Sequence, residues 1–545
     1  MSKFFKWALA VQIVGWAFLP AAAQLQECPQ RPSPGSIVQD GLNLSSSNGA
    51  LTLALALHNG VDAAGFTHYC FDYKAANGST VEAPTLRLNP GDTLNIAFTD
   101  GLNVATPTDT NLRYSAAKIM KHGDMSSGMS SNEPANPCKS TTVDFNTTNI
   151  HFHGLNVPPT CHQDDVINTL IQAGQTFQYQ VQIPTNEPPG LYWYHPHPHG
   201  FTALQVNGGA AGPIVINGME KVKPQVQGLT ERIFMIRQQF LNPLAWIPGP
   251  YQLTLNFQPA TAPASASPIV QMQPNEKQFW RVANATTQGF VTLQMLFGST
   301  AQNLELIALD GVPVTGDPTV TSIVLPPAGR AEFIVTGPPS GTTAQFVNAG
   351  FDTGPVGNAN TFQILANIQT TSSSTVQQPA VTTAPAPSLP AETPRFAGLA
   401  SIKANTQRYL YFSEAALGTN PPVNFFLTVN GKQPKLFTMN EPPAIVTKVG
   451  QVEDWTIENR TSEEHAFHMH QIHFLVTAIN GVPLTTPTMQ DTFPVPYWSG
   501  SGPFPSITVR MDFRDPGIAG TFVFHCHILD HEDAGMMEKI QVNPQ

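Results

Sequence analysis

Charged residues are scarce in this 545-residue chain, and it contains no run of Lys or Arg. Only 12% of the residues are Asp, Glu, Lys or Arg, and the formal net charge at pH 7 is −11. Proteins that bind nucleic acid or anionic membranes through their charge need a basic patch. The composition therefore argues against both kinds of partner.

Long apolar runs are also missing, and no stretch after residue 23 approaches the twenty residues that a spanning helix needs. Residues 7–19 form a shorter apolar stretch, which follows a basic start (MSKFFK) and precedes three alanines at 21–23. This order is typical of a secretory signal peptide. We expect removal of residues 1–23, which leaves a soluble, monomeric protein that begins near Gln24 and is extracellular or periplasmic.

Cysteine is rare, with five residues in the whole chain. An even set of four plus one leftover suits an exported protein with two disulfides, and four cysteines allow three pairings. Cys138 and Cys161 are closest in sequence, which favours their pairing and leaves Cys28 with Cys70. The odd residue is Cys526, which stands between two histidines.

No long helical pattern is present, whereas apolar and polar residues alternate in many short segments. Examples are LTLALAL (51–57), QTFQYQVQIP (175–184), AEFIVTG (331–337) and SITVRMDF (506–513). Fifty prolines and 41 glycines punctuate the chain. Alternation with period two between frequent turns predicts an all-β protein built from β-sandwiches.

A weak internal repeat divides the chain. The segments 89–100, 273–287 and 448–462 each combine a turn, an apolar strand and a polar stop. Residues 371–395 are rich in Ser, Thr, Pro and Ala, as in a linker. We therefore predict three related β units, which span residues 24–218, 219–370 and 396–545.

Histidine is absent from the middle of the chain, since none of the sixteen lies between His199 and His465. The middle unit is therefore expected to supply no metal ligand, and function should arise where the first and third units meet. Nearly all the relevant histidines fall in four clusters, at residues 151–154, 195–199, 465–470 and 525–536.

The last cluster, HCHILDHEDAGM, indicates a site for one copper ion. Alternate residues of a strand face the same side, so the two histidines beside Cys526 face away from its thiol. Cys526, His465 and His531, with Met536 as a weak axial ligand, match the donor set of a blue-copper electron-transfer site. The flanking histidines would reach a second metal site on the other side.

Eight further imidazoles are present, which is more than one ordinary zinc site uses. They could hold three copper ions. A single HxH pair is usually a surface feature or a satisfied core histidine, but four clusters beside a Cys/Met frame are hard to explain in that way. These eight are His151, His153, His195, His197, His468, His470, His525 and His527.

The four clusters resemble the copper-binding motifs of the multicopper oxidases, a family that includes laccases, bilirubin oxidase and bacterial copper oxidases. The resemblance implies three cupredoxin-like Greek-key β-sandwich domains and four copper ions: one type 1, one type 2 and two type 3. It assigns His151 and His468 to type 2, His153, His195 and His527 to one type 3, His197, His470 and His525 to the other, and Cys526, His465 and His531 to type 1.

The sequence differs from the family pattern at two positions, and it offers two candidate catalytic acids. His199 exceeds the family pattern, and we expect it to lie near the site or on the surface without binding copper; Phe152 replaces a Trp found in many relatives. Reducing O₂ to water takes four protons, so positioned acids are required. Glu532, after His531, and Asp164 are the predicted catalytic acids, although Asp165 is an alternative to the second.

The predicted activity is that of a secreted copper oxidase that takes single electrons from a donor, passes them through Cys526 and reduces O₂ to water. A phenol or aromatic amine is the favoured donor, because a metal-oxidising protein should show a clearer Met or carboxylate cluster. The alternative is a metallo-oxidase for Cu(I), Fe(II) or Mn(II) in copper resistance or metal homeostasis. A copper nitrite reductase would need fewer histidines, and a non-catalytic copper carrier would have lost ligands.

Overall fold

The computed structural model describes residues 28–61, 67–103, 136–240, 251–260, 266–371, 395–416 and 423–545. The predicted signal peptide and nearly all of the predicted linker lie outside these residues. Three pairs of β-sheets make up the described chain, so the predicted all-β class with three cupredoxin-like sandwiches is confirmed. No helix among the described residues is long and apolar enough to cross a membrane.

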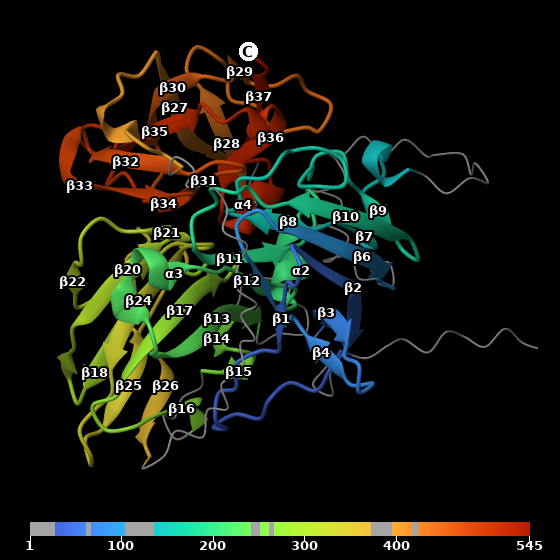
Figure 1. The fold of residues 1–545 in the computed structure, drawn as a ribbon. Helices are drawn as coiled ribbons and strands as arrows, with labels where there is room; N and C mark the ends of the chain where they lie inside the picture. The colour runs from blue at the N-terminus through green and yellow to red at the C-terminus, as the bar shows by residue number, and fades with distance from the viewer. Residues whose placement is uncertain are drawn as a thin grey trace, which may run out of the picture.

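The first sandwich (blue to teal in Figure 1) pairs two five-stranded sheets. One sheet runs β1 (Asn43–Ser45), β5 (Thr85–Leu88), β12 (Gly212–Ile216), β11 (Gly190–His195), β8 (His151–His153). The other runs β10 (Thr176–Gln182), β6 (Thr93–Gly101), β2 (Ala50–Val61), β3 (Thr67–Lys74), β4 (Thr80–Glu82), and a separate pair joins β7 (Thr147–Thr148) to β9 (Ile171–Gln172). Strand β10 alternates exposed and buried side chains, as the sequence pattern predicted.

The second sandwich (green to yellow) also contains two sheets. One runs β15 (Gln258–Pro259), β14 (Tyr251–Leu255), β13 (Thr230–Phe240), β17 (Lys277–Ala285), β24 (Arg330–Thr336), β20 (Leu304–Leu309), β21 (Val312–Pro313), with β22 (Thr319–Val320) on β20. The other runs β16 (Ile269–Met272), β26 (Gln363–Thr370), β25 (Ala344–Asn348), β18 (Val291–Phe297), β19 (Thr300–Ala301), with β23 (Ile323–Leu325) on β18.

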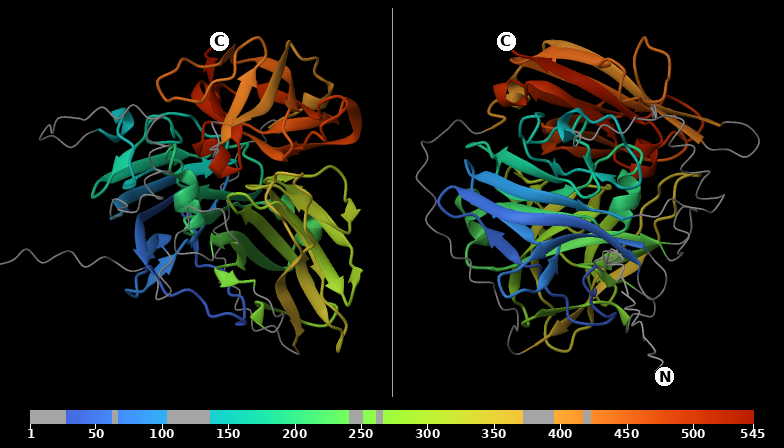
Figure 2. Two further views of the ribbon diagram at one scale, coloured as in Figure 1. Left: turned by 180° about the vertical axis from the view of Figure 1, so that it is seen from behind. Right: turned by 90° about the vertical axis from the view of Figure 1, so that its right-hand side faces the viewer.

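The third sandwich (orange to red) lies across the other two in all three views (Figures 1 and 2). One sheet runs β28 (Val423–Val429), β27 (Thr406–Ala416), β30 (Gln451–Asn459), β35 (Ser506–Phe513), β32 (Phe474–Ile479), β33 (Val482–Gln490). The other runs β29 (Ile445–Lys448), β37 (Met537–Asn543), β36 (Gly520–Cys526), β31 (His465–Met469), β34 (Thr492–Val495). Each sandwich has its own buried apolar core.

The described helices are short. Helix α2 packs against α4, which follows β36, where the first and third sandwiches meet. The described helices are η1 (Pro137–Lys139), α2 (Thr202–Asn207), α3 (Met219–Val222), η2 (Pro224–Val226), η4 (Leu399–Ser401), η5 (Pro516–Ile518) and α4 (Leu529–Asp533).

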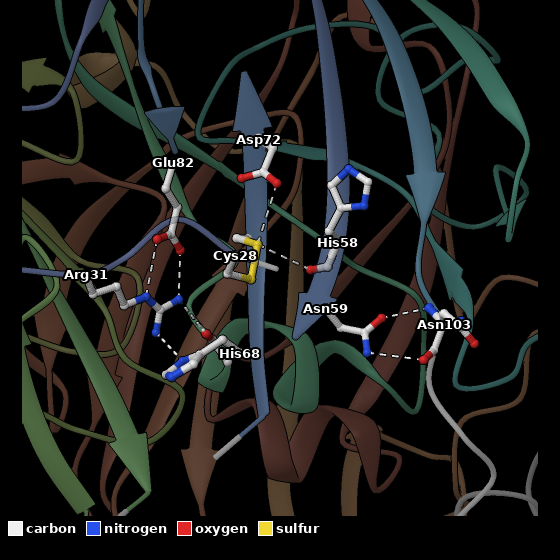
Figure 3. The surroundings of a disulfide bond; sticks show 10 residues. Cys28, Arg31, His58, Asn59, His68, Asp72, Glu82 and Asn103 are labelled. Atoms are coloured by element: carbon white, nitrogen blue, oxygen red, sulfur yellow. Dashed lines mark hydrogen bonds and ion pairs between the residues drawn. A yellow bond between two sulfur atoms is a disulfide. The ribbon is translucent and has the colours of Figure 1, made fainter. Parts of the chain in front are cut away.

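Both predicted disulfides are present. Cys28 pairs with Cys70, and Cys138 pairs with Cys161, while Cys526 is free and buried. Figure 3 shows the first bond, which ties the start of the described chain to β3. The sequence separation of the paired cysteines therefore predicted the connectivity correctly.

Candidate metal centres

Four strands from two sandwiches bring the histidine clusters together. Strands β8 and β11 are antiparallel neighbours in the first sandwich, and their register places His151 opposite His195. Strands β31 and β36 are neighbours in the third sandwich, with His468 opposite His525. The first and third units therefore meet at the histidines, as the sequence indicated.

Candidate ligand atoms within each of four buried sets lie within 4.8 Å of one another. Three sets contain only histidine and share one region, which we call the histidine cluster, and the fourth contains Cys526. The four sets are His151/His153/His468, His153/His195/His527, His197/His470/His525 and His465/Cys526/His531. The structure thus groups the residues as the resemblance assigned them, with His153 additionally close to the His151/His468 pair.

Burial favours the neutral form of seven imidazoles of the histidine cluster, those of His153, His195, His197, His468, His470, His525 and His527. Burial lowers the pKa of His195 and His468 well below the usual value, and neighbouring histidines lower it further. The pKa of His525 falls to about 3, again mainly through burial. A neutral imidazole offers its nitrogen lone pair to a metal, so burial prepares these side chains for coordination.

Hydrogen bonds at the outer nitrogens orient these rings. The Nδ1 atom of His195 lies 2.9 Å from the Pro196 carbonyl oxygen, and that of His525 lies 3.0 Å from the Cys526 carbonyl oxygen. Such acceptors fix the tautomer and turn the opposite nitrogen toward a metal. Buried ring nitrogens without a hydrogen-bond partner occur in His151, His153, His195, His468, His470 and His527.

These unpartnered nitrogens test whether the site fits copper. A buried polar atom without a partner costs about 1–3 kcal/mol, and native proteins rarely keep several together. Here they converge from different strands, and imidazole nitrogens are good ligands for copper. The donor set and its orientation therefore fit bound copper ions.

Cys526 forms a separate site with two histidines. Its Sγ atom lies 3.5 Å from Nδ1 of His465 and 4.0 Å from Nδ1 of His531, and the two Nδ1 atoms are 3.3 Å apart. Burial raises the pKa of the Cys526 thiol to about 12, so a metal ion must displace its proton on binding. The three donors match the trigonal arrangement of a blue-copper site.

The structure separates Met536 from its neighbour Met537. Met536 is fully buried in the same apolar core as Cys526, and its carbonyl oxygen accepts a hydrogen bond from the Cys526 N–H. Met537 packs in a different cluster, with Val523 and Phe437. Met536 is therefore the better candidate for the axial ligand.

This placement leads to the first prediction. We expect Met536→Leu to keep the blue absorption and to raise the reduction potential, because a weak donor to the oxidised metal is lost. Redox titration of the blue band measures the potential, and Met537→Leu is the matched control. An unchanged potential in Met536→Leu, or a shift only in Met537→Leu, would show that the axial residue is misassigned.

Two glutamates lie beside the outer nitrogens of this site and were not predicted from the sequence. Oε1 of Glu414 is 3.4 Å from Nε2 of His465, and Oε1 of Glu463 is 3.3 Å from Nε2 of His531. Burial raises the pKa of Glu463, and the neighbouring Glu414 carboxylate raises it further. The EEH sequence at 463–465 was a usable signal, whereas Glu414 lies on another strand, β27.

Asp164 contacts the histidine cluster directly. Both its carboxylate oxygens lie 3.0 Å from Nδ1 of His151, and Oδ1 also accepts a hydrogen bond from the Phe152 N–H. The alternative, Asp165, is instead bonded to Asn168. The geometry therefore places Asp164, and not Asp165, beside the proposed copper ligands.

Glu532 is fully buried on α4, near His197 of the cluster. Its Oε1 atom lies 4.0 Å from Nδ1 of His197 and 3.9 Å from Nδ1 of His199. Burial raises the pKa of Glu532 well above its usual value, which favours the protonated carboxyl. His199 thus lies beside the acid and outside the four candidate sets named above.

Comparison with known proteins agrees with this geometry. Three family models described as multicopper oxidase match residues 141–221, 235–370 and 414–545, which together are more than half of the chain. A multicopper oxidase of Staphylococcus haemolyticus is 25% identical, covering 73% of this chain and 77% of its own. A Bacillus subtilis laccase is 23% identical, covering 68% and 74%.

Solved structures show the same fold. A Campylobacter jejuni multicopper oxidase, described as a metallo-oxidase, has a TM-score of 0.65 at 20% identity and covers 97% of this chain and 99% of its own. Fet3p, a multicopper oxidase that functions in iron import, has a TM-score of 0.59 at 13% identity and covers 90% of each chain. The chain belongs to the multicopper oxidase family of copper-dependent oxidoreductases.

Proposed function

We propose that this protein couples the one-electron oxidation of a donor to the four-electron reduction of O₂ to water. The observation that carries this proposal is the tripeptide His525-Cys526-His527, which belongs to two candidate metal sites at once. One copper would bind at His465, Cys526, His531 and Met536, and three at the eight histidines of the cluster. Bound copper would supply the electron transfer and the O₂ reduction.

The protein's own contribution is to connect and shield these sites. Cys526 and its two neighbours are fully buried, and their backbone is held between β31 and β37. A covalent path of one residue then links the site that takes electrons from the donor to the site where O₂ is consumed. Solvent exclusion also limits side reactions at the cluster.

Copper content and oxygen stoichiometry test the proposal. The copper-loaded protein should hold four ions, show a blue absorption band, and consume one O₂ per four electrons without releasing peroxide. A fully loaded protein that has the blue band but does not consume O₂ with any donor would instead fit an electron carrier.

The identity of the donor depends on the surroundings of Cys526. The sequence favoured a phenol or aromatic amine because no carboxylate cluster was evident, but Glu414 and Glu463 form such a pair at the outer histidine nitrogens. Hard cations prefer carboxylate oxygen ligands. The geometry therefore supports a reduced metal ion, such as Fe(II), as a second candidate donor and favours it over the phenol.

The second prediction separates the two donors. We expect Glu463→Gln and Glu414→Gln each to raise the KM for Fe(II) at least about tenfold, equivalent to ~1.4 kcal/mol, because an amide replaces a carboxyl group that can bind a cation once it is deprotonated. The KM for a phenol should change much less. Steady-state kinetics with both donors on the same preparations give the comparison.

Glu464→Gln is the matched control, because Glu464 is buried nearby but accepts a hydrogen bond from the Tyr497 N–H. It should leave the KM for Fe(II) unchanged. If Glu463→Gln and Glu414→Gln instead alter only phenol oxidation, the aromatic donor is the correct one.

We also propose that the protein is exported and acts as a monomer. The two disulfides support an oxidising compartment, since such bonds are rare in reducing ones. The leader at residues 1–23 lies outside the described residues.

A further inference from the structure

One buried arginine of the middle sandwich reaches the edge of the histidine cluster. Arg330, at the start of β24, has a fully buried side chain. Its Nη1 donates to Oδ1 of Asp491 at 2.7 Å, and its Nη2 donates to Oδ2 at 2.5 Å. The guanidinium also donates to the carbonyl oxygens of Asp310, Leu191 and Ala328. The pairing with Asp491 is a two-point bond, the strongest arrangement that Arg makes with a carboxylate.

Asp491 in turn contacts two histidines of the cluster. It lies between β33 and β34, where its Oδ1 is 3.1 Å from Nε2 of His153. Its carbonyl oxygen is 2.8 Å from Nδ1 of His468. The Asp310 carboxylate, also from the middle sandwich, accepts hydrogen bonds from the N–H groups of Asp491 and Thr492.

These contacts determine which ring nitrogen faces the cluster. The Asp491 carboxylate contacts Nε2 of His153, and its carbonyl oxygen contacts Nδ1 of His468. The opposite nitrogen of each ring is left buried and without a hydrogen-bond partner. The two rings stack with their centroids 4.1 Å apart, so a shift of one ring would displace the other. A movement of Asp491 would therefore disturb two ligands of the proposed copper cluster.

We propose that Arg330 is a positioning residue for the copper cluster: through Asp491 it holds His153 and His468 in the orientation that binds metal. The middle sandwich, which contains no histidine, would then act on the site through Arg330, with Asp310 supporting the backbone of Asp491. The inference rests on the proposed function, because it assumes that the cluster binds copper.

Gly154 provides independent support for a close contact at this point. It follows His153 in the HFHG motif and has φ +89°, a conformation that favours glycine. A Cβ atom there would lie 2.4 Å from Nη2 of Arg330 and 2.7 Å from Oδ2 of Asp491. The glycine of the motif therefore leaves the room that the Arg330–Asp491 pair occupies.

The third prediction compares two buried arginines of the middle sandwich. We expect Arg330→Lys to lose the two-point bond, since Lys keeps the charge but lacks the planar fork. Loss of an outer partner of metal-binding histidines typically lowers metal affinity about 10–100-fold. Copper of the cluster should therefore be removed by a chelator at about 10–100-fold lower concentration, and its EPR signal should change, while the blue absorption stays.

Arg232→Lys is the matched control. Arg232 is also fully buried, but it bonds to Asp40 and to the Val38 carbonyl oxygen, away from the cluster. It should keep the parent's EPR signal and resistance to the chelator. Equal copper loss in both variants, or parent-like behaviour of Arg330→Lys, would overturn the proposal. Absence of cluster copper in the parent itself would instead overturn the proposed function.

A second variant covers the case in which Arg330→Lys does not fold. Asp491→Asn keeps the side-chain size and the carbonyl oxygen that faces His468, but it removes the charge paired with Arg330. It should change the EPR signal in the same direction, again with the blue band intact. A folded Asp491→Asn with the parent's EPR signal and chelator resistance would also contradict the proposal.

Discussion

Replacing Cys526 with serine is expected to abolish the blue absorption and reduce oxidase turnover to background, while the histidine cluster still loads copper. The colour of a blue-copper site arises from its thiolate ligand, and a hydroxyl does not replace that soft donor. Cys526 is also the one residue that the Cys/His/His set shares with the tripeptide leading to the cluster. The substitution therefore interrupts both the entry of electrons and their covalent path.

Three measurements on one preparation check this expectation. The visible spectrum reports the Cys526 site, total copper should fall from four ions to three, and O₂ uptake reports turnover. Serine is close in size to cysteine, and the thiol packs in the core of the third sandwich, so the fold should be retained. A blue band that survives in Cys526→Ser would show that another residue provides the thiolate-like ligand, and the assignment would fail.

The fold and the metal-binding sets could be predicted because both depend on local patterns. Alternation with period two places His151 and His153, or His525 and His527, on one side of a strand whatever the rest of the chain does. Strand pairing then brings β8 to β11 and β31 to β36. These ligand pairs can therefore be recognised in the sequence as short motifs within single strands.

The residues that support the ligands could not be found in this way. Arg330 and Asp491 are 161 positions apart, in different sandwiches, and neither belongs to a histidine motif. A buried ion pair of this kind forms only when two domains pack, and no periodicity reports it. Because the middle unit contains no histidine, the sequence predicted only that it supplies no metal ligand. Arg330 and Asp310 of this unit contact Asp491. Asp491 in turn contacts His153 and His468.

Glu414 was missed for the same reason. It lies on β27, while His465 begins β31, and the two strands belong to opposite sheets of the third sandwich. Only the packing of one sheet on the other brings the carboxylate to the ring. The proposal of a metal-ion donor therefore rests on a contact between sheets, which the sequence pattern that favoured a phenol does not report.

The proposed reduction of O₂ requires protons at the buried cluster, and we propose Glu532 as their donor. Its carboxyl lies about one ordered water's distance from two histidine nitrogens, 4.0 Å from His197 and 3.9 Å from His199. Burial raises its pKa, which favours the protonated form that a proton donor needs.

We therefore expect Glu532→Gln to keep four copper ions and the blue band but to slow O₂ reduction by about 10²–10⁴-fold, the usual contribution of one general acid. Gln matches the shape of the acid and cannot donate a carboxyl proton. Stopped-flow traces should show normal reduction by the donor and slow reoxidation by O₂. Glu538→Gln, which changes a buried acid on β37 that lies near Lys435 and Lys432, should reoxidise normally.

The comparison with Asp164→Asn decides between the two acids. Asp164 is bonded directly to Nδ1 of His151, so Asp164→Asn should disturb a proposed copper ligand. We expect Asp164→Asn to change the EPR signal of the cluster as well as the rate, whereas Glu532→Gln should change the rate alone. Normal reoxidation in Glu532→Gln with slow reoxidation in Asp164→Asn would move proton delivery to Asp164. Normal rates in both variants would contradict proton delivery by either acid, because a donor that the reaction requires cannot be removed without slowing it.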